Sequence, residues 1–272
     1  KLAYHIQDLQ IEAARDLQMI TSQQVIDLLF GVEQFIFNRS DLITSVGTGM
    51  VAKIQEKTPR PVALFPNWTD VAQFYPVPDR GRLKPEFGFQ PTDRIALYSG
   101  AIGEKQGLEA ILHAAVAFQH QPEVKFVICG SGPYKEKLQG LARELAVANV
   151  VFLPLQPFDK FNDFLNLADV HLVIQKANAG DLVMPSKLTT VLAVGGVALI
   201  TSNPGSGMHA LVQQHGMGLL VAAENQAALN AGLADALGHD HTAVAKNARR
   251  YAEEYLSIES VMRAYERRLL AS

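Results

Sequence analysis

The sequence has only one cysteine, Cys129, among its 272 residues. A single cysteine cannot form an internal disulfide, which excludes the disulfide-stabilised class of secreted domains and fits a reducing cytosol. The sequence also lacks an apolar run of about 20 residues, the length that a membrane-spanning helix requires. It has no signal-peptide pattern. We therefore expect a cytoplasmic protein.

Neither sign of charge is in large excess, because 24 Lys and Arg residues oppose 27 Asp and Glu residues. There is no basic tail and no acidic block. Proteins that bind nucleic acid usually carry a basic surface, so nucleic acid is not expected as a partner. Hydrophobic residues make up 48% of the chain, which is enough for the core of one large or two ordinary domains.

Several catalytic motifs are absent from the sequence. There is no G-x-S-x-G nucleophile motif, no P-loop and no H-E-x-x-H zinc motif. No Asp-x-Asp pair occurs, which removes the usual carboxylates for a metal-bound diphosphate. The run His239-Asp240-His241 contains metal-ligating residue types, but neighbours in a short turn seldom converge on one ion. The sequence therefore predicts no metal site.

After about residue 89, short apolar segments alternate five or six times with helical patterns. Strands that are apolar throughout are typical of sheets with both faces covered. The alternation predicts an α/β fold, a Rossmann-like parallel sheet with helices on both faces and right-handed crossovers. The predicted strands are 95–98, 124–129, 150–153, 170–174, 197–200 and 218–221, and the predicted helices include 107–118, 134–146, 158–167 and 226–237.

The first part of the chain forms a smaller unit in this prediction. A helix is predicted over 25–38 and short strands over 42–46 and 62–65. The prolines and glycines of 71–89 indicate a linker. We predict a first domain over 1–88, a second domain over 89–250 and a C-terminal helix over 251–272. The opening residues look like the middle of a strand, so we expect a missing upstream part.

The segment from Asp169 to Ser202 reads as strand, loop, helix and strand. Pro185 suits the first turn of the helix. The N–H groups there and the positive end of the helix dipole can bind an anion such as phosphate. Ser186 can add a hydroxyl donor, and Lys187 can add a positive charge. A capped helix with a solvated lysine fits the same pattern.

Two loops that contain glycine follow predicted strands. The first, 99–107, contains Gly100, Gly103 and Lys105, and the second begins at Gly130. Glycines allow a ligand to approach the backbone, and a lysine can neutralise a phosphate. Neither loop has the G-x-G-x-x-G spacing of a dinucleotide site, so plain strand-to-helix turns are an alternative. Because both loops and the Pro185 helix start should open at the carboxyl edge of one sheet, we favour a ligand that carries phosphate.

The order of these segments resembles the family 4 (group 1) glycosyltransferases of the GT-B fold, and more narrowly the colanic acid biosynthesis subgroup. The resemblance extends over most of the chain. The family segments are 66–70, 99–107, 127–133, 167–170, 185–188 and 216–221, and the subgroup segments are 5–8, 103–107 and 181–189.

The resemblance implies two Rossmann-like domains that face each other across a cleft. Only the second half of the first, acceptor domain (1–88) would be present, the second domain (89–250) would bind the nucleotide sugar, and the last helix (251–272) would return toward the first domain. It implies transfer of a sugar, with retention at the anomeric carbon, from a nucleotide diphosphate sugar to a growing, lipid-linked cell-surface polysaccharide. No cofactor or metal is implied, so fixed donors must stabilise the charge on the leaving diphosphate. The implied partners are the donor, a saccharide or lipid-linked acceptor, and the inner face of the membrane as a peripheral contact.

The resemblance also implies roles for individual residues. Lys105 and Lys187 would contact the diphosphate, and His5 would face the sugar and acceptor from the first domain. Asp181 would stand near the sugar. The implied donor-binding residues are Gly100, Gly103, Gly130, Leu155, Gln156, Met184, Pro185, Ser186, Leu188 and Thr190.

Two departures from the family pattern leave the base and sugar specificity open. Many relatives carry two glutamates eight positions apart, and the matching positions here are Leu182 and Thr190. Asp181 is one residue away from the first of them. The arginine usual after the first glycine of the 99–107 loop is replaced by Ala101. The alternatives are a fragment that binds a nucleotide sugar without turnover, and a GT-B nucleotide-sugar epimerase, whose need for acid–base groups is poorly met.

Overall fold

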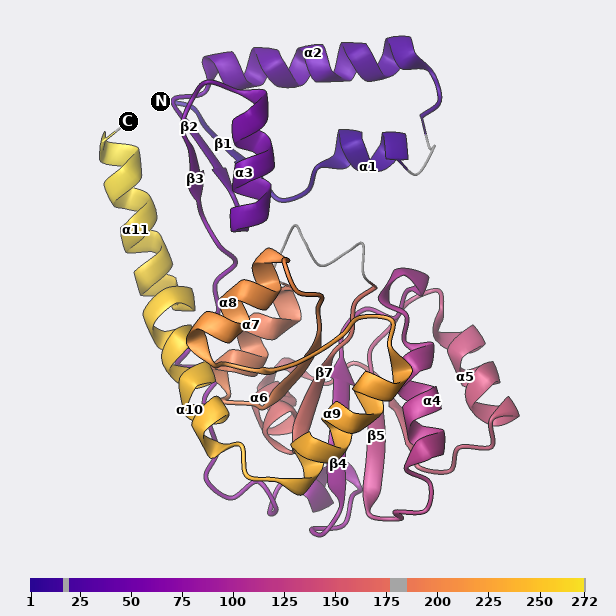
Figure 1. The fold of residues 1–272 in the computed structure, drawn as a ribbon. Coiled ribbons are helices and arrows are strands. Elements are labelled where there is room, and N and C mark those ends of the chain that lie inside the picture. The colour runs from indigo at the N-terminus through magenta and orange to yellow at the C-terminus, as the bar shows by residue number, and fades with distance from the viewer. Residues whose placement is uncertain (17–19, 177–184, 272) are drawn as a thin grey trace. The chain divides into compact units, whose positions relative to one another are not determined.

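The computed structural model describes residues 1–16, 20–176 and 185–271. The chain divides into two compact units (Figure 1). In the described part, the first unit comprises residues 1–67 and 259–271, and the second comprises 68–176 and 185–258. Within these ranges, no helix is both long enough and apolar enough to cross a membrane.

The first unit contains a three-stranded parallel sheet in the order β1-β2-β3. Its core brings together Phe37, Ile43, Met50 and Ile54, which are fully or almost fully buried. The Tyr265 ring of the last helix lies 4.6 Å from the Phe65 ring, so that helix packs beside the end of β3. The elements are β1 (Ala3–Ile6), α1 (Gln10–Asp16), α2 (Gln23–Arg39), β2 (Leu42–Ser45), α3 (Thr48–Lys57), β3 (Val62–Leu64) and α11 (Ile258–Ala271).

The second unit is built on a six-stranded sheet in the order β6-β5-β4-β7-β8-β9. Every pair of neighbouring strands is parallel. The strand order reverses between β4 and β7, and such a switch point is where open α/β sheets bind ligands. The strands are β4 (Arg94–Ser99), β5 (Val124–Cys129), β6 (Val150–Leu153), β7 (Val170–Val173), β8 (Ala198–Thr201) and β9 (Leu219–Val221).

Helices cover both faces of this sheet, as the alternating pattern predicts (Figure 1). The predicted α/β fold with parallel sheets is therefore confirmed. The α-helices are α4 (Glu109–Ala117), α5 (Lys135–Glu144), α6 (Phe158–Asn166), α7 (Ser186–Ala193), α8 (Gly207–His215), α9 (Gln226–Gly238) and α10 (Thr242–Tyr251). The short helical turns are η1 (Lys84–Phe87), η2 (Glu104–Gln106) and the π-helical η4 (Ala252–Leu256).

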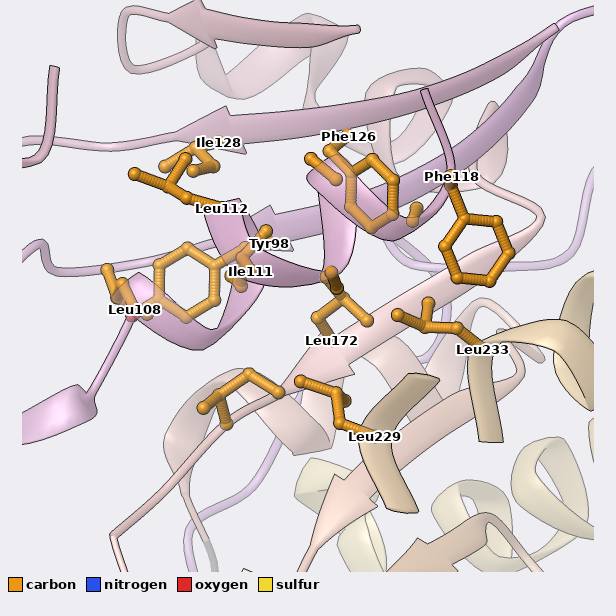
Figure 2. Close-up of a cluster of buried hydrophobic side chains, with 14 of the residues drawn as sticks. Tyr98, Leu108, Ile111, Leu112, Phe118, Phe126, Ile128, Leu172, Leu229 and Leu233 are labelled. Atoms are coloured by element: carbon orange, nitrogen blue, oxygen red, sulfur yellow. The ribbon is translucent and has the colours of Figure 1, made fainter. Parts of the chain in front are cut away.

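The main core lies on the face of the sheet that α4 and α9 cover. Figure 2 shows Leu108, Ile111, Phe126 and Leu229 of this cluster, together with the ring of Tyr98. Successive side chains of a strand point to opposite faces. Ala96 and Tyr98 of β4 therefore enter this core, while Leu97 and Ser99 face α6 and α7 on the other side.

The division between the units differs from the predicted boundary near residue 88, because residues 68–88 belong to the second unit. The backbone N–H groups of Tyr75 and Val77 donate to the side-chain oxygens of Asn162 and Asn166, each at 2.9 Å. The prolines and glycines of this segment predict correctly that it lacks long helices or strands. These residues do not show that the segment is bound to α6 through Asn162 and Asn166.

The predicted C-terminal helix over 251–272 is also interrupted. The turn η4 follows α10, and Ser257 then has an extended backbone before α11 begins. Ser257 forms a parallel bridge with Thr69, and Thr69 N–H donates to Leu256 O at 2.8 Å. This long-range backbone pairing breaks the helix. Residues 251–258 contain no proline or glycine that would mark the break in the sequence.

Candidate functional site

A cavity of about 440 Å³ lies at the carboxyl edge of the second sheet. Ser99 and Gly100 from the end of β4, and Val173 from the end of β7, line it at the switch point. Helices α6 and α7 supply other parts of its wall. Six of the predicted site residues contribute to the lining, namely Gly100, Leu155, Gln156, Ser186, Lys187 and Thr190.

Lys187 is the charged residue of this lining, within the described part of the chain. Its Nζ donates to the hydroxyl of Tyr98 at 2.8 Å and lies 4.0 Å from the centre of the Tyr98 ring. A Cβ atom added to Gly100 would lie 3.1 Å from the same Nζ. The ammonium group is therefore held against the β4 loop and is not a freely solvated lysine.

Burial shifts the pKa values of both members of this pair. It lowers the pKa of Lys187 to about 8 because the charged ammonium loses solvation. Burial also raises the pKa of Tyr98, so its hydroxyl stays protonated and can accept from Lys187. Tyr98 donates its own proton to Ala101 O at 2.6 Å. At neutral pH Lys187 is thus mainly a partly buried cation held by a neutral phenol.

The start of α7 is arranged differently from the predicted anion site. Pro185 is the N-cap residue, and Ser186 is the first residue of the helix. The N–H of Leu188 donates to Pro185 O at 2.9 Å, and the Leu188 side chain is fully buried. Thr190 Oγ1 donates to Lys187 O at 3.0 Å. Leu188 therefore has neither its amide nor its side chain available, whereas Ser186 and Thr190 line the cavity.

The glycines of the two loops mainly allow one loop to pack on the other. A Cβ atom on Gly130 would lie 1.9 Å from Gly100 O, and one on Gly132 would lie 2.1 Å from Ile102 O. Backbone hydrogen bonds run from Gly100 N to Cys129 O and from Ile102 N to Ser131 O. Gly130 and Gly103 lie outside the residues that line the cavity. Their roles in holding a donor stay predictions.

Two lining residues, Cys129 and His171, are not among the residues predicted for the site. Cys129 Sγ donates to Pro154 O at 3.1 Å, and burial raises the pKa of the thiol. His171 is buried in β7, where loss of solvation, and then repulsion from Arg80, lower its pKa to about 3. Both groups are therefore uncharged at neutral pH. The alternation along β4 and β7, which places Ser99 and His171 on one face, is the signal that could have indicated this lining.

The remaining predicted residues are placed as follows. His5 lies near the carboxyl end of β1 in the first unit, where its Nδ1 is 3.0 Å from Thr44 Oγ1 and its ring meets the Phe65 ring edge-on at 5.1 Å between centroids. Burial lowers the pKa of His5. Asp181 and Met184 lie outside the described residues, as does the side chain of Lys105, whose backbone belongs to η2.

No group of three or more His, Cys, Asp or Glu side chains is gathered in a way that could hold a metal ion, as far as the described ranges extend. The described lining of the 440 Å³ cavity also contains no carboxylate. Its polar groups are hydroxyls, a thiol, an amide, an imidazole and one ammonium, and such a set suits an anion.

A larger cavity, about 610 Å³, lies at the opposite edge of the same sheet, beside Asp169 and Val197. Two partly buried arginines of its lining already have partners in the structure. Arg249 donates to Phe74 O and Ala193 O, and Arg80 donates to Gly195 O. These contacts hold segments of the unit together, so the carboxyl edge remains the better candidate for binding.

The family model described as glycosyl transferases group 1 matches residues 79–255. Among curated proteins, the chain is 36% identical over 270 residues to WcaI of Escherichia coli (strain K12), named as a colanic acid biosynthesis glycosyl transferase. The match covers 96% of this chain and 65% of that protein, so the chain spans less than two thirds of this relative's length.

Solved structures of low sequence identity share the fold. HepE (Alr3699) of Anabaena, crystallised in complex with UDP and glucose, superposes with a TM-score of 0.79 at 15% identity, over 100% of this chain and 72% of that chain. The C-terminal domain of the group 1 glycosyl transferase LpcC from Francisella tularensis has a TM-score of 0.57 at 16% identity, over 70% of this chain and 99% of that chain.

Proposed function

Because the chain belongs to the group 1 glycosyl transferases, we propose that it transfers a sugar from a nucleoside diphosphate sugar to a growing cell-surface polysaccharide. The family membership confirms the resemblance found in the sequence. The polysaccharide is proposed from the name of the E. coli relative, and the donor class from the UDP and glucose bound to the Anabaena structure. A lipid-linked acceptor and retention at the anomeric carbon are part of the proposal.

The observation that carries the proposal is the Lys187 ammonium, held against the Gly100 loop at the switch point. In the transfer, the bond between the anomeric carbon and the diphosphate breaks, and negative charge develops on the leaving group. A fixed cation in a water-poor cavity stabilises that charge more strongly than a solvated cation would. We propose that Lys187 supplies this stabilisation without a metal ion.

The other wall of the cavity suits the nucleoside. Leu155, Phe158 and Phe161 give it an apolar surface, and Gln156 and Ser99 add polar groups. A nucleobase needs such a mixture of stacking surface and hydrogen-bonding groups. An epimerase would need acid–base groups here. In the described lining, Cys129 and His171 are buried and neutral, and the Lys187 ammonium is held by Tyr98.

The first experiment measures binding of UDP, GDP and UMP by calorimetry. We expect Lys187→Ala to weaken binding of a nucleoside diphosphate about 10- to 100-fold, because a charge-assisted contact is lost, and to affect UMP less. Lys160→Ala is the matched control, since Lys160 lies on α6 and is about half exposed. Unchanged affinity in Lys187→Ala would contradict the diphosphate assignment.

The second experiment supplies nucleoside diphosphate sugars and lipid-linked saccharides to the protein and analyses the products by mass spectrometry. A product lengthened by one sugar, with release of the nucleoside diphosphate, supports transfer. Tight binding without a lengthened product would favour the alternative of binding without turnover. The anomeric configuration of the product tests retention.

A further inference from the structure

Tyr98 has two different environments at the two ends of its side chain. The ring belongs to the core cluster on the α4 and α9 face of the sheet, and the residue has no exposed surface. The hydroxyl lies at the carboxyl edge, where it accepts from Lys187 Nζ at 2.8 Å and donates to Ala101 O at 2.6 Å. A residue that only fills the core would not need these two polar contacts.

The Lys187 side chain therefore reaches from α7 to a fixed point on β4. Two contacts define that point: the Nζ donates to the Tyr98 hydroxyl, and it lies 4.0 Å from the centre of the Tyr98 ring. Gly100 leaves room for the ammonium there because it has no Cβ atom. A lysine side chain loses about 2 kcal/mol of conformational entropy when it is fixed. If the side chain is already fixed in the free protein, the free energy of ligand binding does not include this entropy loss.

The neighbouring titratable groups leave this contact undisturbed. The Cys129 thiol on β5 and the His171 imidazole on β7 are uncharged at neutral pH. Lys176, which follows β7, lies on the Gly107 side of the loop. No carboxylate lines the cavity in the described part of the chain. Tyr98 is thus the group on β4 that supplies a hydrogen bond to the Lys187 ammonium.

We propose that Tyr98 is a positioning residue for donor binding. Tyr98 holds the Lys187 ammonium at the Gly100 loop, where the diphosphate binds. The inference rests on the proposed function, because it takes the ligand to be a nucleoside diphosphate. Tyr98 itself contacts neither the donor nor the acceptor. It acts through Lys187 and through the Ala101 carbonyl.

The test is the variant Tyr98→Phe, which keeps the ring in the core and removes only the hydroxyl. We expect the Kd for UDP, or for GDP if the protein prefers it, to rise about 3- to 10-fold, as for the loss of one hydrogen bond. Tyr134→Phe is the matched control, since the Tyr134 hydroxyl donates to Glu109 away from the cavity. This control should bind like the wild type.

A pH profile separates positioning from a merely structural effect. The lysine binds a diphosphate when it is protonated, so wild-type affinity should be high below pH 8 and should fall as the pH rises through about 8, the pKa of Lys187. Without the Tyr98 hydroxyl the ammonium loses an acceptor, and its pKa moves further down. The fall in affinity should therefore begin at lower pH in Tyr98→Phe than in the wild type.

A double-mutant cycle gives the deciding measurement. In a Lys187→Ala background, Tyr98→Phe should have little further effect, because the residue through which it acts is gone. Equal losses in both backgrounds would overturn the inference, as would an unchanged Kd and pH profile in Tyr98→Phe. Wild-type protein that binds no nucleoside diphosphate would instead contradict the proposed function.

A second variant keeps the test decisive if Tyr98→Phe does not fold. The methyl group of Gly100→Ala would lie 3.1 Å from Lys187 Nζ and would push the ammonium away from Tyr98, while the positive φ of Gly100 adds a backbone strain that does not depend on Lys187. The loss of affinity should therefore be clearly smaller in the Lys187→Ala background than in the wild type. A loss of the same size in both backgrounds would show that the contact between Lys187 and the β4 loop does not matter for binding.

Discussion

Lys84 is a buried lysine whose ammonium has two partners in the second unit. Its Nζ donates to Asp169 Oδ2 at 2.9 Å and to Asp93 O at 2.5 Å. The same Asp169 oxygen accepts from Ile95 N at 2.7 Å. These contacts join the 68–88 segment to the first residues of β4 and to the start of β7. Asp169, which belongs to the family pattern, therefore has a structural role here.

Replacing Lys84 tests this role. Lys84→Met should lower the free energy of unfolding by roughly 2 kcal/mol, because it removes the ammonium that neutralises a partly buried carboxylate and donates to a buried carbonyl. Chemical denaturation followed by circular dichroism measures the change. Lys125→Met is the control, since Lys125 Nζ donates to the nearby Pro122 O at the surface. Adding Asp169→Asn to Lys84→Met should recover part of the loss, and a further loss would refute this reading.

At the scale of single residues, the sequence predicts the charged groups better than their partners. Lys187 follows from the helix start after Pro185, and the structure places it in the cavity. Tyr98 follows from no pattern, because a tyrosine within an apolar strand looks like a core residue. Its contact with a lysine 89 positions later depends on which strands are neighbours in the sheet.

At the scale of elements, the loops after β4 and β5 behave as one structure. The carbonyl of Gly100 occupies the space beside Gly130, and the carbonyl of Ile102 occupies the space beside Gly132. Tyr134 N–H then donates to Ile102 O at 3.3 Å, which connects the start of α5 to the first loop. The path of the Gly100 loop, and with it one wall of the cavity, is set by glycines of a different loop.

The variant Gly132→Ala should therefore be strongly destabilising. Its methyl group would lie 2.1 Å from Ile102 O, so the backbone of one loop must move. We expect a loss of about 3 kcal/mol in the free energy of unfolding, together with weaker UDP binding. Gly140→Ala is the same substitution inside α5, with nothing closer than 3.9 Å, and should stabilise by about 0.5 to 1 kcal/mol. Equal effects of the two substitutions would contradict the interlocked loops.

Most strands and helices of the second unit can be predicted from the sequence, because apolar periodicity records which faces are buried. The strands 124–129 and 150–153 agree with β5 and β6 at both ends. The break at Ser257 and the packing of residues 68–88 could not be predicted in the same way. Both depend on hydrogen bonds to residues far away in the sequence, and these leave no local pattern.

At the scale of the whole molecule, the second unit has its own sheet and its own core. All six strands and the Tyr98 cluster lie within residues 68–258. The solved C-terminal domain of the Francisella protein covers a comparable part of the fold. The last helix, α11, contributes its residues from Glu259 onward to the first unit, where Arg268 donates to Leu64 O at 3.0 Å.

We therefore expect the fragment 68–258 to fold on its own and to bind a nucleoside diphosphate with a Kd within about threefold of that of the full chain, because every described residue that lines the 440 Å³ cavity belongs to this unit. Cooperative thermal unfolding and calorimetry check the two parts of the prediction. A fragment that folds but does not bind would mean that the first unit supplies a necessary contact. An unfolded fragment would show that the two units are interdependent.

The double environment of Tyr98 has a practical consequence for engineering this protein. Substitutions chosen to tighten the packing around its ring would also displace the oxygen at the other end of the same side chain. Heat resistance and ligand affinity would then change together among variants of the cluster. A library selected only for thermal tolerance would thus be selected, unintentionally, for altered recognition of the donor.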